Sequence, residues 1–337
     1  MLSNNEITSH TKEVAIIVAV RNEQNYIRKC LDSLLNQDFP PDRFQIIVID
    51  GLSEDNTKSV VEEYQKRFPE RITLYDNPNR VQAVGRNIGI KNSSSEFVLY
   101  IDGHSQPSSS YVRKLVTILR TSPRIAGIGG IHQSPNDETF FGKAINIAQG
   151  SLLGGGRSSY RPKTKPNFVD PLSFCMYRRS VLEKTGLFNE SLVSGEDYEL
   201  NWRIRHLGYN LMTTPDAVVY YYRRYNTLKR FIVRMSQYGF WKGKISRIHP
   251  ASIKPLFFLP IFLIVLCVLI LPLSIIRPDL AYLDLIFITG YLIAVLATSV
   301  LATVKEHDFR YIIIFVIIIV EHFAIGVGSI AGFMKKS

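Results

Sequence analysis

The sequence predicts an α/β domain built on a mostly parallel open sheet, followed by a C-terminal α-helical transmembrane region. Three stretches that differ in pattern support this. Residues 13–222 alternate short apolar runs with segments of helical period, residues 223–254 are strongly basic, and residues 255–337 are strongly apolar. With 46% hydrophobic and 20% charged residues in 337, the chain is too apolar for an ordinary soluble domain and too polar to lie wholly in lipid.

The α/β prediction rests on two alternating periods. Val14–Val20 is an almost continuous apolar run, typical of a strand buried on both faces, and residues 27–35 then repeat apolar side chains on one helix face. Further strands are predicted at 46–49, 72–75 and 97–101, and further helices at 60–68, 81–90 and 112–119. Strands that alternate with helices indicate a mainly parallel sheet, in which ligands bind beyond the carboxyl ends of the strands.

Polar residues follow three of the predicted strands. They are Arg21-Asn22-Glu23, Asp50 to Asp55, and Asp102-Gly103-His104. Each Asp-Gly pair could be a simple turn, but helix-period segments follow both pairs, which argues against hairpins. We therefore expect two carboxylates from different strands in one cleft, where a diphosphate would need a divalent cation.

Other nucleotide and metal motifs are missing from the sequence. No GxGxxG follows a strand and no GxxxxGK[ST] occurs, which disfavours a dinucleotide oxidoreductase and a P-loop ATPase. The glycines at 326, 328 and 332 lie in an apolar segment, where small residues serve helix packing. Cys30, Cys175 and Cys267 are far apart, so neither a disulfide framework nor a zinc site is indicated.

Three segments of the C-terminal region, at about 256–276, 285–304 and 311–333, are long enough to cross a membrane as helices. Glu321 and His322 are the ionisable residues of the third, and they are expected to face a polar partner, such as another span or a lipid diphosphate. Upstream, residues 223–254 contain nine Lys or Arg and no acidic residue.

The basic segment has apolar residues at helical spacing, beginning with Leu228, Phe231, Ile232 and Met235. This pattern predicts a helix in the headgroup layer that binds anionic lipids, although a solvated surface helix would have the same charge. A nucleic-acid partner is disfavoured because no binding motif accompanies the charge. The N-terminus is polar and lacks a signal-peptide core. A cytoplasmic N-terminus places eleven basic residues inside against three outside, which predicts an external C-terminus.

Five segments, taken in order, resemble a family-2 inverting glycosyltransferase of the Rossmann-like glycosyltransferase A fold. The resemblance covers residues 13 to about 250, and its segments are Arg21-Asn22-Glu23, Asp50 to Thr57, Gly85 to Gly89, Asp102-Gly103-His104 and Gly195-Glu196-Asp197. His104 stands where the family usually has an Asp. With the run at 196–203 and the membrane region, this change is most similar to the succinoglycan-type exopolysaccharide branch.

The resemblance implies a nucleotide site formed by Glu23, Asp50, Ser53, Arg86 and Asp102. Asp50 would accept a hydrogen bond from the base with Glu23 nearby, and the planar fork of Arg86 would pair with phosphate oxygens or stack on the base. Asp102 would contact the ribose or the cation.

The metal site implied by the resemblance consists of Asp102 and His104. Imidazole suits Mn²⁺ better than Mg²⁺, so Mn²⁺ is expected to be the better cofactor. A solvent-facing turn residue is the other interpretation of His104.

Asp197 is the expected general base, with Glu196 as the alternate, because an attacking hydroxyl must lose its proton as the new bond forms. A structural interpretation coexists with this one: Ser194 and Asp197 form an S-x-x-D capping box ahead of a helix that runs to Gly208. Residues 150–170, rich in Gly, Pro and cationic side chains, form either a lid over the diphosphate or an ordinary surface loop.

These features imply transfer of one sugar from a nucleotide-sugar, expected to be a UDP-sugar, to a polyprenyl-diphosphate-linked glycan at the inner face of a bacterial membrane. One alternative is a polyprenyl-phosphate sugar synthase, and another is a non-catalytic membrane-anchored sensor or scaffold that binds a nucleotide. A processive polymer synthase is disfavoured because no QxxRW follows the acidic pair. The sequence does not indicate an oligomeric state.

Overall fold

The structure, a computed structural model, describes residues 12–154, 165–224, 227–252, 257–266, 272 and 276–335. The chain divides into two compact units. The sheet unit comprises Met1–Gln133, Pro162–Ser191 and Glu196–Tyr221, and the helical unit comprises Ser134–Arg161, Leu192–Gly195 and Tyr222–Ser337. Residues 134–161 and 192–195 therefore group with the C-terminal helices, which the division of the sequence at residue 222 does not anticipate.

The sheet unit contains a nine-stranded sheet among the described residues, in the order β3-β2-β1-β4-β8-β6-β9-β5, with β7 paired to β9. The four predicted strands are all present and mutually parallel, with β1 in their centre. The second half of the sheet is mixed: β8 runs antiparallel to β4 and β6, β6 and β9 are parallel, and β5 and β7 are antiparallel to β9. The strands are β1 (Val14–Val20), β2 (Phe44–Asp50), β3 (Ile72–Asp76), β4 (Phe97–Asp102), β5 (Ser105–Pro107), β6 (Ile125–Gln133), β7 (Asn167–Phe168), β8 (Met176–Arg178) and β9 (Asn210–Tyr221).

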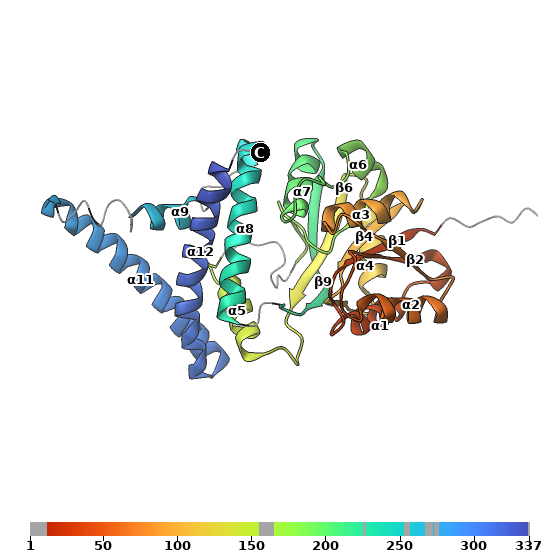
Figure 1. Cartoon of the computed structure of the whole chain (residues 1–337), viewed down its shortest axis with the longest axis horizontal. Helices are drawn as coiled ribbons and strands as arrows, with labels where there is room; N and C mark the ends of the chain where they lie inside the picture. Colours follow the sequence, from red (N-terminus) through yellow and green to blue (C-terminus); the bar gives the residue numbers. More distant parts are fainter. Residues whose placement is uncertain are drawn as a thin grey trace, which may run out of the picture. The chain divides into compact units, whose positions relative to one another are not determined.

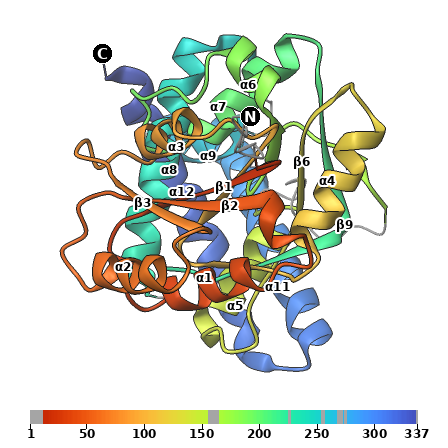
Figure 2. The ribbon, with the colours of Figure 1, turned by 90° about the vertical axis from the view of Figure 1, so that its right-hand side faces the viewer.

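Helices cover both faces of this sheet, with α3 on one side and α1 and α2 on the other (Figure 2). A Cβ added to Gly89 of α3 would lie 2.7 Å from Ile17 Cγ2 and 2.9 Å from Ile49 Cδ1. Glycine thus lets α3 lie close against β1 and β2. The helices of this unit are α1 (Ile27–Leu35), α2 (Thr57–Arg67), α3 (Gln82–Lys91), α4 (Tyr111–Thr121), α6 (Arg179–Thr185) and α7 (Glu196–His206), with a 3-10 turn at Pro41–Arg43.

The core of the sheet unit is the apolar cluster predicted from the alternating pattern. The β1 strand is buried along almost its whole length, and α1 contributes Ile27, Cys30, Leu31 and Leu34 to the same cluster. Each fully buried Leu or Ile side chain contributes about 1.5–3 kcal/mol to stability. Cys30 and Cys175 are buried free thiols, and Cys267 lies outside the described residues.

The helical unit is arranged around α12, which packs against α5, α8, α9 and α11 (Figure 1). A second apolar cluster joins α5, α8, α11 and α12, and it includes Phe231, Met235, Val295 and Ile317. The helices of this unit are α5 (Phe140–Gly150), α8 (Leu228–Ile248), α9 (Phe258–Val265), α11 (Pro278–Glu306) and α12 (Ile314–Met334), with 3-10 turns at Pro250–Ser252 and Phe309–Ile313.

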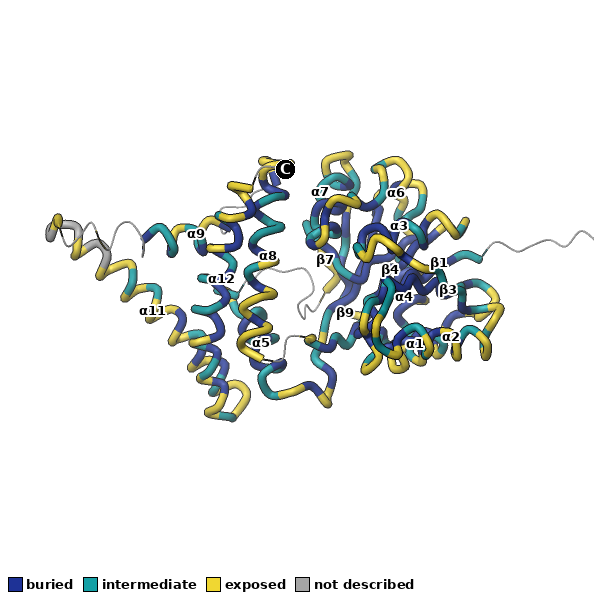
Figure 3. Tube along the Cα trace, in the orientation of Figure 1, coloured by how far each residue is buried: buried dark blue, intermediate teal, exposed yellow. Residues whose placement is uncertain are grey.

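Two stretches of the described residues are long and apolar enough to cross a membrane: Leu285–Glu306 and Phe309–Met334. The α11 helix is exposed along most of its length (Figure 3), with Leu285, Ile286 and Leu301 each more than 60% exposed. An apolar surface of this extent is unusual on a protein surrounded by water. The first predicted span, 256–276, lies partly outside the described residues, and α11 begins at Pro278, before the second span predicted at 285–304.

The basic segment forms α8 as predicted, but its apolar stripe contacts protein. Phe231, Met235 and Ile245 are buried, and α8 packs along α12. Leu228 and Ile232 of the same stripe stay exposed. A helix buried on one side by α12 is therefore not an isolated helix on a lipid surface.

Glu321 and His322 are both buried, at 4% exposure. Gln149 of α5 donates a hydrogen bond to Glu321 Oε1 at 3.0 Å. His322 Nε2 lies 3.0 Å from the Leu153 carbonyl, and its Nδ1 lies 3.0 Å from the Tyr291 hydroxyl. The two ionisable residues thus have polar partners on α5, on α11 and in the segment that follows α5.

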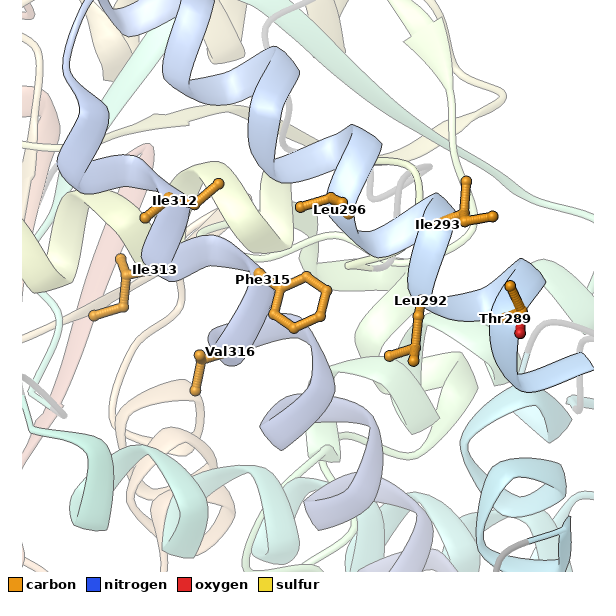
Figure 4. A pocket seen from close by; sticks show the side chains of 8 residues that line it. All are labelled: Thr289, Leu292, Ile293, Leu296, Ile312, Ile313, Phe315 and Val316. Atoms are coloured by element: carbon orange, nitrogen blue, oxygen red, sulfur yellow. The ribbon is translucent and has the colours of Figure 1, made fainter. Parts of the chain in front are cut away.

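An apolar cavity of about 600 Å³ lies where α11 meets the start of α12 (Figure 4). Its lining includes Leu292, Ile293, Phe315 and Val316. No ionisable side chain lines it, so it offers nothing to a nucleotide.

Candidate functional site

The carboxyl ends of three neighbouring strands place the predicted acidic residues at one edge of the sheet. Val20, the last residue of β1, pairs with Asp50 of β2, and Ala19 pairs with Asp102 of β4. Asp50 and Asp102 therefore flank β1 at nearly the same level. Two strand spacings separate their Cα atoms by about 10 Å.

The loops that follow β1 and β2 are hydrogen-bonded to each other. Asn22 donates its backbone N–H to Ser53 Oγ at 3.0 Å and accepts from the backbone N–H of Glu54 at 2.9 Å. Glu23 donates its backbone N–H to Thr57 Oγ1 at 2.7 Å. Asn22 has a positive φ of 56°, a conformation that asparagine tolerates better than most residues. The site is thus preorganised by side chains of the Asp50–Thr57 segment.

Asp50 is fully buried and holds the start of its own loop. Its two carboxylate oxygens accept from the Ser53 backbone N–H at 2.9 Å and from the Ser53 hydroxyl at 2.6 Å. Each oxygen retains a second lone pair, so a hydrogen bond from a nucleotide base stays a prediction. The Ser53 hydroxyl points to Asp50, so the nucleotide contact predicted for Ser53 would come from its remaining lone pair.

Arg86 of α3 joins the strand end to α7. Its guanidinium donates to Glu196 Oε1 at 2.6 Å and to Asp102 Oδ1 at 3.2 Å, and it lies 4.1 Å from the centre of the Tyr100 ring. Burial opposes its charge, but Glu196 and Asp102 outweigh that effect and raise the pKa of Arg86. Both terminal nitrogens of the guanidinium thus donate to protein carboxylates. This favours a role in positioning Glu196 and Asp102 over the predicted contact with phosphate.

Gln82 and Asn87 complete this arrangement, and neither was predicted. Gln82 donates to the same Asp102 oxygen as Arg86, at 2.9 Å. Asn87 donates to the Phe188 carbonyl and accepts from the Phe188 backbone N–H, which fixes the aromatic ring beside Arg86. Gln82 and Arg86 are four residues apart on α3 and share one helix face, so helical spacing could have identified Gln82.

Glu196 and Asp197 lie in the first turn of α7, where the helix dipole favours negative charge. Burial, together with the charge of Asp197, raises the pKa of Glu196 to about 7 against the opposing pull of Arg86. Burial also raises the pKa of Asp197, with Asp102 adding to the effect and Arg86 opposing it. Asp197 Oδ1 accepts the Tyr198 backbone N–H at 2.7 Å. Two carboxyl groups with raised proton affinity thus stand side by side next to Asp102.

His104 is held between two protein side chains. Its Nδ1 lies 2.8 Å from Glu23 Oε1 and its Nε2 lies 3.1 Å from the Tyr221 hydroxyl. A carboxylate only accepts, so Nδ1 donates, and the lone pair of a neutral ring at Nε2 accepts from Tyr221. In this geometry the hydroxyl of Tyr221 occupies the direction that a metal ion bound to His104 would need.

The residues present fit a cation that arrives with its substrate. Among the described residues no three His, Cys, Asp or Glu side chains cluster as a metal site. Mg²⁺ is commonly held by one or two carboxylates plus substrate phosphates, and Mn²⁺ also suits oxygen ligands. Asp102, with its side chain 18% exposed, could supply one such carboxylate.

The predicted lid falls mostly outside this description. Residues 155–164 are not among the described residues. On the far side of them, Asn167–Phe168 pairs with β9 and Asp170 forms an ion pair with Arg205 at 2.8 Å. Residues 167–170 are thus tied to the sheet unit.

Known proteins resemble this chain in sequence, one of them over 96% of its length. The family described as glycosyl transferase family 2 matches residues 15–186. A dolichyl N-acetyl-alpha-D-glucosaminyl phosphate 3-beta-D-2,3-diacetamido-2,3-dideoxy-beta-D-glucuronosyltransferase of Methanococcus voltae is 30% identical over 333 residues, covering 96% of this chain and 97% of that protein. The succinoglycan biosynthesis protein ExoA of Rhizobium meliloti is 26% identical over 245 residues, 72% of each chain.

The fold also occurs in a solved structure. The mannosyltransferase PcManGT of Pyrobaculum calidifontis, in complex with GDP-Man and Mn²⁺, superposes with a TM-score of 0.63. The match covers 95% of this chain and 88% of that one at 19% sequence identity. The similarity therefore extends over both units of the chain.

Proposed function

This chain belongs to glycosyl transferase family 2, and on that premise we propose that it moves one sugar from a UDP-sugar to a lipid-linked glycan with inversion at the anomeric carbon. It is a glycosyltransferase with the glycosyltransferase A fold. The observation that carries the finer proposal is the group formed by Asp102, Arg86, Glu196 and Asp197 at the carboxyl edge of the sheet.

The proposed chemistry is a single displacement. The acceptor hydroxyl attacks the anomeric carbon, the new C–O bond forms, and the bond to the diphosphate oxygen breaks on the opposite face. Asp197 takes the hydroxyl proton, for which its raised pKa makes it a stronger base than an ordinary aspartate. Glu196 is tied to Arg86 at 2.6 Å, which leaves Asp197 as the preferred base of the pair.

The remaining residues hold the donor. Asp50 and Glu23 line the position proposed for the base, and Asp102 would hold a divalent cation that neutralises charge on the departing diphosphate. We propose Mn²⁺ as the better cation, with His104 as a further ligand once the Tyr221 hydroxyl leaves its Nε2. The solved structure of the mannosyltransferase PcManGT, which has the same fold, contains Mn²⁺, and this supports a divalent cation here.

The C-terminal helices and the relatives support the proposed acceptor and location. The M. voltae relative is named for a dolichyl-linked acceptor, and the R. meliloti relative for succinoglycan biosynthesis. We propose a polyprenyl-diphosphate-linked glycan as acceptor, in cell-surface or exopolysaccharide synthesis at a bacterial inner membrane. The sheet unit would face the cytoplasm, and α8 would contact anionic lipids.

The test incubates membranes that carry the protein with separate nucleotide sugars, Mn²⁺ and extracted polyprenyl-diphosphate glycans, and then weighs the lipid products. A product heavier by one sugar, and absent with Asp197→Asn, supports the proposal. A product formed only on polyprenyl monophosphate would instead identify a polyprenyl-phosphate sugar synthase. Nucleotide binding without any transfer would leave the non-catalytic sensor or scaffold.

A further inference from the structure

The α8 and α12 helices are in contact through their backbones. A Cβ added to Gly239 or Gly243 of α8 would overlap the carbonyl oxygens of Ile325 and Ser329, respectively. Reciprocally, Gly332 of α12 lies against the Phe240 carbonyl. Only glycine permits such an approach, so the two helices form one rigid seam.

The two helices run parallel and end at the same level. Contact positions rise together along both, from Gly239 with Ile325 to Gly243 with Ser329. At the end of the seam, Arg247 donates to the carbonyls of Phe333 and Lys335, at 3.3 and 2.7 Å. Figure 1 shows α8 and α12 side by side over their length. Each has 21 residues, or about 31 Å of helix.

This alignment fixes how deeply α8 can lie if α12 crosses a membrane. A crossing α12 would carry α8 through the hydrocarbon beside it, because the seam spans the same levels. The α8 helix contains six basic residues and no acidic one: Lys229, Arg230, Arg234, Lys242, Lys244 and Arg247. The contact pairs place Arg234 level with the middle of α12, and Arg230 and Arg234 are both exposed. Exposed arginines at the centre of a bilayer are strongly disfavoured.

The polar residues of α12 lead to the same conclusion. Glu321 and His322 are buried against Gln149 of α5, Tyr291 of α11 and the Leu153 carbonyl in the segment that follows α5. A helix with polar partners near its middle is poorly suited to lipid on all sides. By contrast, α11 exposes Ile286, Ile293 and Leu301 along its length.

We propose that α8 and α12 lie together in the plane of the membrane surface, with Arg230 and Arg234 on anionic lipid headgroups and α12 on the hydrocarbon side. The crossings are then α11 and the span that the sequence predicts at 256–276, of which the structure describes Phe258–Val265 as α9. An even number of crossings returns the C-terminus to the side of the N-terminus. This differs from the external C-terminus predicted from charge counts alone.

The decisive measurement is the depth of a spin label on the full chain in liposomes that contain phosphatidylglycerol. Val327→Cys on α12 and Ile293→Cys on α11 both replace exposed residues near mid-helix. Collision with oxygen and with a water-soluble nickel chelate should place Val327 within about 5–10 Å of the headgroup boundary, and Ile293 deeper, towards about 15 Å. Equal depths for the two labels would overturn the proposal.

Topology provides a second readout that does not depend on transferase activity. A membrane-impermeant maleimide should label Ser3→Cys and Ser337→Cys only after cells are opened, with the unsubstituted chain as background. Labelling of Ser337→Cys in intact cells, with Ser3→Cys protected, would refute the in-plane arrangement.

Headgroup binding is tested by fluorescence quenching of Trp241 in α8, in a Trp202→Phe background. Brominated phosphatidylglycerol should quench more than brominated phosphatidylcholine at equal mole fraction. Replacing Arg230 and Arg234 with glutamine should abolish that difference. Equal quenching by the two lipids in the parent protein would remove the anionic headgroup from the proposal.

Discussion

Replacing Glu196 with glutamine measures how much the buried, ionised carboxylate lowers the free energy of unfolding. The pKa of Glu196 is raised from 4.5 to about 7, first by burial and then by Asp197, and this value already includes the attraction of Arg86. The folded state binds the proton more tightly than the unfolded state. Stability is therefore lost as pH rises from about 4.5 to about 7.

The magnitude follows from the two pKa values. At 1.36 kcal/mol per pH unit, the ionised Glu196 costs about 3 kcal/mol above pH 7. At pH 5 the cost falls below about 1 kcal/mol, because the unfolded state is also partly protonated there. Glutamine stays neutral and removes the cost, so Glu196→Gln should be about 3 kcal/mol more stable than the parent at pH 8.

The assay is thermal unfolding of the full chain in detergent, followed by Trp202 fluorescence on α7 in a Trp241→Phe background. A gain of about 3 kcal/mol raises Tm by roughly 6–12 °C in a domain of this size. Glu183→Gln on α6, whose side chain is 61% exposed, is the matched control and should leave Tm unchanged at both pH values. A Glu196→Gln protein that is no more stable at pH 8 than at pH 5, relative to the parent, would refute the reasoning.

Four further outcomes test the site and the seam. Asp197→Asn should lower turnover by about 10²–10⁴ without lowering Tm, because burial raises the pKa of Asp197 and asparagine stays neutral; near-parental turnover would point to another base. In Arg86→Lys a single ammonium group replaces the two donors that bind Asp102 and Glu196, so the free energy of unfolding should fall. The upper bound is the roughly 3–5 kcal/mol lost when a buried ion pair is broken, and an unchanged Tm would contradict the bridge. Tyr221→Phe should raise, and His104→Ala should lower, the ratio of Mn²⁺ to Mg²⁺ activity, whereas equal ratios would exclude His104 from the metal. Gly332→Val should lower Tm, because a side chain at this position would clash with the Phe240 carbonyl and push α12 away from α8. An unchanged Tm would contradict this contact.

The first half of the sheet and its acidic strand ends were predictable from the sequence. Val14–Val20 and its neighbours are buried on both faces, so their apolar runs are long, and the parallel register sets Asp50 and Asp102 at one level. The later strands were not predicted. The β8 strand has three residues and β7 has two, too short for any period to be visible.

The bridge formed by Arg86 was beyond sequence reasoning because it depends on contacts between distant positions. Arg86 and Glu196 are 110 residues apart, and the packing of α3 on β1 and β2 together with that of α7 on β9 and α6 brings them within 2.6 Å. The pattern of α8 predicted the helix but not its partner α12, for a related reason. An apolar stripe fits lipid and a neighbouring helix equally well, and the four-residue spacing of Gly239 and Gly243 favours the helix.

The shared arginine also couples donor binding to the readiness of the base. Asp102 raises the pKa of both Glu196 and Asp197, while Arg86 lowers the pKa of each. Once the charge of Asp102 is neutralised within a donor complex, it no longer competes for Arg86 and no longer repels ionisation of its two neighbours. Both pKa values then fall, so a larger fraction of Asp197 is ionised at a given pH. Three carboxylates around one guanidinium thus form a site in which a bound donor is expected to lower the pKa of the proposed base, Asp197.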